Sequence, residues 1–308
     1  SGSVTWYGIY GAGSPVYQAL YNNSVSNVLI SGSSTSTAGT VRAITTNTIS
    51  TGLADTYNNT VKNIGFASGT TTGTAAGIHI STSANNVYKN KVATVFAAQA
   101  SGIAYGIQAI SGTTNNIYNN VVSDITTPNA NSSNALGGIY VSGGTTANIS
   151  YNTVYLGGGT PLTSTGALFG GSGIYIASTT AATIRNNIVN VAATANGDAY
   201  FSALKRSAAG TAGVKPTNIT ASNNIYNAPY IYGEGTTLST ATNVFYVSGG
   251  TTGTADPNFN TSCGLYKVFM QENNTFTENN LVSVGPDLFA PSGSSFAESA
   301  ATTSTTPV

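Results

Sequence analysis

A short unit close to Asn-x-Val returns along this chain at intervals of about 30 to 37 residues. Its instances read YNNSV, YNNTV, YKNKV, YNNVV, SYNTV, RNNIV and SNNIY. The asparagine expected at the equivalent position of each unit is Asn23, Asn59, Asn90, Asn120, Asn152, Asn187 and Asn224. A β-sandwich has turn signals at similar spacing but no reason to repeat one Asn position, so the pattern favours a stacked repeat architecture.

A second unit, close to Gly-Ile-x-Ile, precedes many of the Asn units and reads as a short strand with alternating sides. One face is expected to carry Ile78, Ile107, Ile139 and Ile174, and the other His79, Gln108, Tyr140 and Tyr175. An apolar pair, such as Val61 and Ile64, follows the Asn. Short strands separated by Gly and Asn turns, with no helical period, describe one rung of a coil.

Stacking such rungs in parallel buries a continuous core, and stacked Asn side chains at a tight turn can form hydrogen bonds from rung to rung. The sequence therefore predicts an all-β fold, a right-handed parallel β-helix (β-solenoid) with about seven or more irregular rungs. The repeats are assigned to residues 1–230, an atypical terminal coil or cap to 231–290, and a Ser/Thr/Pro-rich tail or linker to 291–308. The tail is expected either to dock on a neighbouring subunit or to fold back on its own chain.

Charge excludes several classes of function. The 308 residues carry no formal net charge and only 6% are charged, while 40% are hydrophobic, which gives no electrostatic footprint for nucleic acid and no disordered composition. No apolar run approaches the roughly 18 residues of a membrane span, so no membrane insertion is expected.

A start without Met or a signal-like segment fits a processed exported protein or an excised segment. Cys263 is the only cysteine, so we expect no intramolecular disulfide.

The stretches GIQAISGTTNNIYNNVVSDI (106–125) and GIYVSGGTTANISYNTVYLGG (138–158) resemble the parallel β-helix repeats of very large surface proteins exported by Bacteroidetes-type bacteria. The resemblance covers about residues 7–230. It implies a β-helix fold and an extracellular or cell-surface location, and it carries over no functional residue. Pectin-degrading enzymes share the architecture, so the fold does not separate an enzyme from a scaffold.

Catalytic groups are sparse in the repeats. Residues 1–197 contain two acids, Asp55 and Asp124, and the other acids are scattered without a paired motif at Asp198, Glu234, Asp256, Glu272, Glu278, Asp287 and Glu298. His79 is the only histidine and is interpreted as a solvated strand residue, which leaves no multi-His metal site and no expected cofactor. We therefore expect no enzymatic activity, with a polysaccharide lyase or glycoside hydrolase as the alternative.

Two kinds of surface residue are candidates for contacts. The outward side chains of Tyr10, Tyr140 and Tyr175 are either a partly covered ladder or flat faces for sugar rings or another subunit. Of seven Asn-x-Ser/Thr sites, Asn131 is a glycosylation candidate because it lies in an expected loop. The sequence thus favours a non-enzymatic extracellular structural or adhesive β-solenoid that self-associates, as in a homopolymeric surface filament. The alternative is a carbohydrate-binding or polysaccharide-cleaving β-helix.

Overall fold

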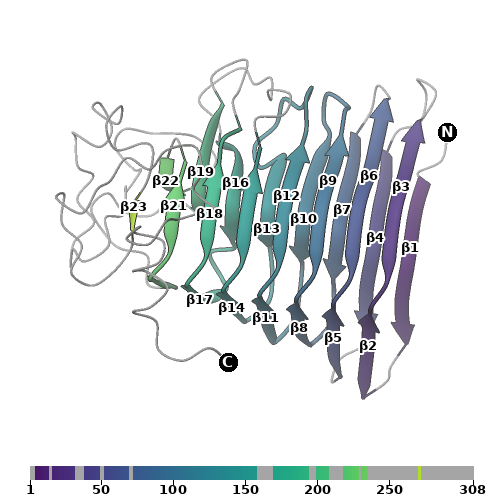
Figure 1. Ribbon diagram of the computed structural model, residues 1–308, viewed down its shortest axis with the longest axis horizontal. Coiled ribbons are helices and arrows are strands. Elements are labelled where there is room, and N and C mark those ends of the chain that lie inside the picture. Colours follow the sequence, from purple (N-terminus) through teal and green to yellow (C-terminus); the bar gives the residue numbers. More distant parts are fainter. Residues whose placement is uncertain are drawn as a thin grey trace, which may run out of the picture.

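The computed structural model describes residues 4–13, 16–31, 38–48, 52–68, 72–157, 169–193, 199–207, 218–228, 230–234 and 270–271. These residues form strands and turns without a helix, arranged as an elongated coil in which strands of successive repeats lie side by side (Figure 1). No helix able to cross a membrane is found in this described part of the chain.

The strands form three sheets, each containing one strand from every repeat. Sheet A is made of β1 (Val4–Gly13), β4 (Ala38–Thr48), β7 (Thr72–Ile80), β10 (Ile103–Ala109), β13 (Leu136–Val141), β16 (Phe169–Ile176), β19 (Tyr200–Arg206) and β22 (Tyr230–Glu234). Sheet B is made of β2 (Tyr17–Tyr21), β5 (Leu53–Tyr57), β8 (Ala84–Tyr88), β11 (Thr114–Tyr118), β14 (Thr146–Ser150), β17 (Ala181–Arg185) and β20 (Ile219–Ser222). Sheet C is made of β3 (Ser24–Ser31), β6 (Thr60–Ser68), β9 (Lys91–Ala97), β12 (Val121–Thr126), β15 (Thr153–Leu156), β18 (Ile188–Val191), β21 (Ile225–Asn227) and β23 (Met270–Gln271).

Each set of three consecutive strands, one from each sheet, is called a rung. Rung 1 is β1 to β3, and the series continues in threes to rung 7, which is β19 to β21. Equivalent strands of neighbouring rungs pair in parallel. For example, Ile107 of β10 lies opposite Ile78 of β7 on one side and Ile139 of β13 on the other. The expected all-β parallel solenoid is confirmed, while its right-handedness stays a prediction.

The core is a narrow apolar column inside the three sheets. The isoleucines expected on the inner face of sheet A are fully buried at Ile78, Ile107, Ile139 and Ile174. The apolar pair after each ladder asparagine is buried as well, for example Val122 and Ile125 in β12. Because a buried Ile or Val contributes about 1.5–3 kcal/mol over an exposed one, this repeated column is a main source of stability.

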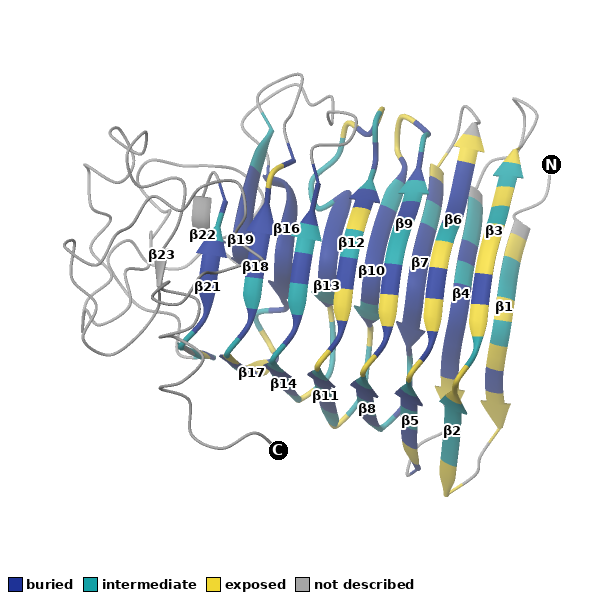
Figure 2. Ribbon diagram, in the orientation of Figure 1, coloured by how far each residue is buried: buried dark blue, intermediate teal, exposed yellow. Residues whose placement is uncertain are grey.

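The two ends of the solenoid differ from its middle. Rung 1 is the most exposed part of the coil in Figure 2. At the other end β22 extends sheet A to Glu234, slightly past the expected boundary at residue 230, and β23 pairs antiparallel with β21. Apart from 231–234 and 270–271, the expected cap (231–290) and tail (291–308) lie outside the described residues, as does Cys263.

Candidate functional site

The seven repeated asparagines lie above one another where sheet B turns into sheet C. Side-chain amides join successive members over 2.8–3.0 Å, from Nδ2 of one to Oδ1 of the next. The ladder is Asn23, Asn59, Asn90, Asn120, Asn152, Asn187 and Asn224, of which the last six are buried and Asn23, in exposed rung 1, is half-buried.

Each interior member of the ladder uses both ends of its amide. Asn120 Oδ1 accepts hydrogen bonds from the backbone N–H and the Nδ2 of Asn90, at 3.0 and 2.9 Å. Asn120 Nδ2 donates to Asn152 Oδ1 at 3.0 Å and to the Val87 carbonyl at 2.8 Å. An amide has two donor hydrogens and two acceptor lone pairs, so these contacts fill it. Aspartate lacks the donors and glutamine is longer, which explains the strict repetition of Asn.

A left-handed backbone position precedes every ladder asparagine. The residue before it has φ between 53° and 58° at Asn22, Asn58, Lys89, Asn119, Tyr151, Asn186 and Asn223. Asn adopts this conformation more readily than other residues with a Cβ, which accounts for the frequent Asn-Asn doublets. The sequence reasoning missed this position, although the doublet was a readable signal for it.

Of the two interpretations of the outward tyrosines of sheet A, the structure agrees with a partly covered ladder at Tyr140 and Tyr175. Tyr140 is stacked between Tyr105 and Tyr175, with ring centroids 4.0 and 4.2 Å away, so both of its faces are occupied. Tyr175 is buried. Tyr10 is 46% exposed, but its ring contacts Tyr7 and it lies in rung 1, far along the column from Tyr140. Tyr140 and Tyr175 therefore belong to a covered ladder, while a contact role for exposed Tyr10 stays a prediction.

His79 is buried, so its interpretation as a solvated strand residue is wrong. It lies in register between Thr45 and Gln108 on the outer side of sheet A and is only 2% exposed. Burial, together with the nearby positive charge of Arg42, lowers the pKa of His79 to about 3. Neither ring nitrogen has a hydrogen-bond partner among the described residues. Alternation within one strand shows which way a side chain points and not whether it is covered, so it could not reveal this burial.

Lys205 continues the same column and was missed by the sequence reasoning. Its side chain is fully buried, its Nζ donates a hydrogen bond to Asn134 Oδ1, and it lies 5.2 and 5.5 Å from the ring centroids of Phe169 and Tyr175. Burial lowers the pKa of Lys205 to about 7. The sequence carries no signal for Lys205, because rung 7 lacks the Gly-Ile unit that marks this column in other rungs. The Phe169 and Tyr175 rings near its Nζ belong to rung 6.

Sheet B carries an aromatic column that the sequence reasoning also missed. Tyr21, Tyr57, Tyr88 and Tyr118 stack with centroids 4.9–5.0 Å apart and ring planes within 6° of parallel. These tyrosines stand two residues before the ladder asparagine, so the repeated unit already contained them. Their stacking follows from the parallel register, which places identical side chains in successive rungs on top of one another.

A polar column runs beside the tyrosines on the outer face of sheet B. Asn148 Nδ2 donates to Asn116, Asn116 Nδ2 donates to Asn86, and Asn86 Nδ2 donates to Asp55, all over 2.8–2.9 Å. Asp55 also accepts a hydrogen bond from the Tyr17 hydroxyl at 2.7 Å. That bond, with smaller contributions from burial and charge, raises the pKa of Tyr17 to about 12.

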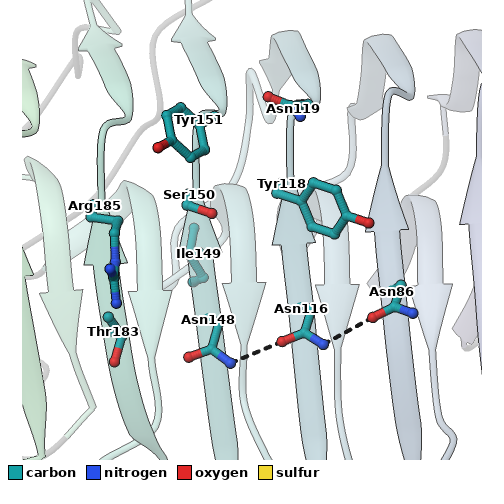
Figure 3. A pocket seen from close by; sticks show the side chains of 10 residues that line it. All are labelled: Asn86, Asn116, Tyr118, Asn119, Asn148, Ile149, Ser150, Tyr151, Thr183 and Arg185. Atoms are coloured by element: carbon teal, nitrogen blue, oxygen red, sulfur yellow. Dashed lines mark hydrogen bonds between the residues drawn. The ribbon is translucent and has the colours of Figure 1, made fainter. Parts of the chain in front are cut away.

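A depression interrupts this face where the aromatic column ends. After Tyr118 the equivalent positions are Ser150 and then Arg185. Figure 3 shows the small Ser150 side chain between Tyr118 and Arg185 along the coil. The depression of about 440 Å³ is lined by these three residues and their neighbours. We call this depression the sheet B notch, and its lining includes Tyr118, Asn116, Asn148, Ser150, Tyr151, Thr183 and Arg185. It offers an aromatic face, amides, hydroxyls and a guanidinium group.

The remaining candidate residues do not meet at this notch. Asp55 lies in β5 of sheet B and Asp124 in β12 of sheet C, so the structure keeps these acids on different faces of the coil. Asn131 is exposed in the loop between β12 and β13. Within the described ranges, no group of three or more His, Cys, Asp or Glu side chains could hold a metal ion.

Comparison of the chain with protein-family models, with curated proteins and with solved structures finds no match in any of the three.

Proposed function

We propose that this chain is a non-enzymatic structural or adhesive β-solenoid that works outside the cell and associates with copies of itself. Three columns of side-chain contacts support a mechanical role, because the inner Asn ladder, the outer Asn–Asp column and the tyrosine stack all join one rung to the next. Such contacts stiffen a rod along its axis. The extracellular location rests on the resemblance to exported surface repeats.

The observation that carries self-association is the open edge of rung 1. Within the part of the chain that the structure describes, strands β1, β2 and β3 each pair on one side only. Most of the large apolar side chains that are exposed in the described residues gather at this edge, namely Tyr10, Val16, Tyr17, Tyr21 and Leu29. Unpaired strand edges with apolar side chains readily pair with another strand. A rung from a second copy fits this edge, as would a rung formed by further chain preceding Ser1.

Sedimentation velocity over a concentration series tests this proposal. Leu29 is 53% exposed on the edge strand β3, and Leu29→Lys places there a charge that opposes strand addition. We expect the wild-type chain to associate with increasing concentration and the variant to associate at least about tenfold more weakly.

Val121→Lys is the matched control. Val121 is 45% exposed on β12, also in sheet C, but rungs on both sides cover the edges of that strand. The control is expected to associate like the wild type. A wild-type chain that stays monomeric at every concentration, or two variants with equal effects, would contradict association through rung 1.

A further inference from the structure

We propose that the sheet B notch is a binding site for an acidic sugar unit of a polysaccharide, held against Tyr118 and paired through its carboxylate with Arg185. This inference goes beyond self-association and does not depend on it, because the notch lies on the side of the coil in rungs 4 to 6, away from the edge of rung 1.

The shape of the notch follows from one change in the repeat. The Tyr118 ring is stacked with Tyr88, with the centroids 4.9 Å apart, and it lines the notch next to Ser150, its neighbour in the column. Tyr118 and Arg185 are two rungs apart, which at a strand spacing of about 4.8 Å is roughly 10 Å. A flat ring fits against the tyrosine within that distance and still leaves room for a contact with the guanidinium group. The volume of about 440 Å³ is in the range of small-molecule sites.

The polar groups beside the ring suit a ligand rich in hydroxyls. Asn148 Nδ2 donates to Asn116 Oδ1, but no described residue donates a hydrogen bond to Asn148 Oδ1, which therefore keeps an acceptor at the notch. Each amide nitrogen of this column uses one hydrogen within the column and has a second one to offer. The Thr183 and Ser150 hydroxyls add groups that both donate and accept. Figure 3 shows these side chains along one side of the notch.

The positive charge of Arg185 favours an anionic ligand at the notch. Arg185 is exposed, and among the described residues its nearest acid along the outer face of sheet B is Asp55, four rungs away at roughly 19 Å. Asp55 is already engaged with Tyr17 and Asn86. A guanidinium group presents a planar set of donors that matches a carboxylate in bidentate geometry. A sugar acid combines all three requirements, since its ring carries C–H groups for the tyrosine face, hydroxyls for the amides and a carboxylate for Arg185.

Isothermal titration calorimetry of the full chain tests this site with oligosaccharide probes. Four acidic tetrasaccharides serve as probes, and each contains one kind of unit: β-1,4-glucuronate, mannuronate, guluronate or α-1,4-galacturonate. Each is compared with its carboxyl-reduced form. At least one acidic tetrasaccharide is expected to bind, and its reduced form is expected to bind at least tenfold more weakly. Benzoate serves as a probe for an aromatic carboxylate, and equal or tighter binding of benzoate would overturn the assignment to a sugar.

Three variants locate the binding. Ser150→Tyr extends the tyrosine stack into the notch, so it is expected to abolish binding while keeping the fold, which circular dichroism would check.

Tyr118→Ala is expected to weaken binding at least tenfold, whereas Tyr21→Ala, at the far end of the same stack, leaves it unchanged. Arg185→Gln is expected to remove the preference for the acidic form, whereas the exposed Lys91→Gln in sheet C keeps it. Absence of binding to all four acids, or binding that survives Ser150→Tyr, would overturn the proposal.

Discussion

At the scale of single residues, the requirement for Asn comes from a hydrogen-bond arrangement that no other side chain reproduces. The sequence predicted both the identity and the stacking of these residues, because one position repeated at nearly constant spacing. It gave the wrong surroundings for His79, which is buried and close to the charge of Arg42, and it missed buried Lys205, which lies near the Phe169 ring of another rung. Alternation within a strand tells which way a side chain points and not what lies over it.

The ladder makes a specific prediction for stability at Asn120. Asn120→Ala removes the acceptor for two donors of Asn90 and the donor to the Val87 carbonyl in a buried setting. Because buried polar groups without partners are costly, we expect a loss of about 2–4 kcal/mol in the free energy of unfolding. Asn116→Ala is the control, since Asn116 has a similar side-chain bond on the outer face of the same rung and should cost less than about 1 kcal/mol. Urea denaturation measures both, and equal losses would contradict a special role of the inner ladder.

At the scale of elements, the turn from sheet B to sheet C repeats in all seven rungs with one left-handed residue before the ladder asparagine. Its left-handed residue is usually Asn but is Lys89 in rung 3 and Tyr151 in rung 5, with φ of 56° and 58°. A second left-handed position follows four residues after the ladder asparagine in rungs 1 to 4, at Asn27, Asn63, Thr94 and Asp124. The sequence predicted strands and turns well, but it could not assign turn conformations, because both positions also accept residues without a left-handed preference.

Lys89 provides the test of this turn. Lys89→Asn relieves the left-handed strain at an exposed site, so we expect a gain of about 0.5–1 kcal/mol in the free energy of unfolding. Lys91→Asn is the matched control, because Lys91 is an exposed lysine in the adjoining strand β9 without a positive φ. It should be neutral or slightly destabilising. A gain from the control as large as that from Lys89→Asn would show that charge, and not backbone conformation, is responsible.

At the scale of the whole molecule, parallel stacking turns each repeated position into a column along the coil. Columns of identical residues give the Asn ladder and the tyrosine stack, and a change in one column gives the sheet B notch. The notch could not be predicted from the sequence, because it requires knowing that Tyr118, Ser150 and Arg185 are consecutive members of one column. Because the strands of rung 1 stand at one end of all three described sheets, we propose that stacking continues at this edge.

Electron microscopy of the purified full chain distinguishes continued stacking of rungs from other kinds of association. Seven rungs at about 4.8 Å span roughly 34 Å, so head-to-tail stacking predicts fibres of constant width with a subunit repeat of at least about that length. Contact of two rung 1 edges with each other would instead stop at a dimer. We expect regular fibres that Leu29→Lys abolishes, whereas single particles or dimers at every concentration would rule out head-to-tail stacking.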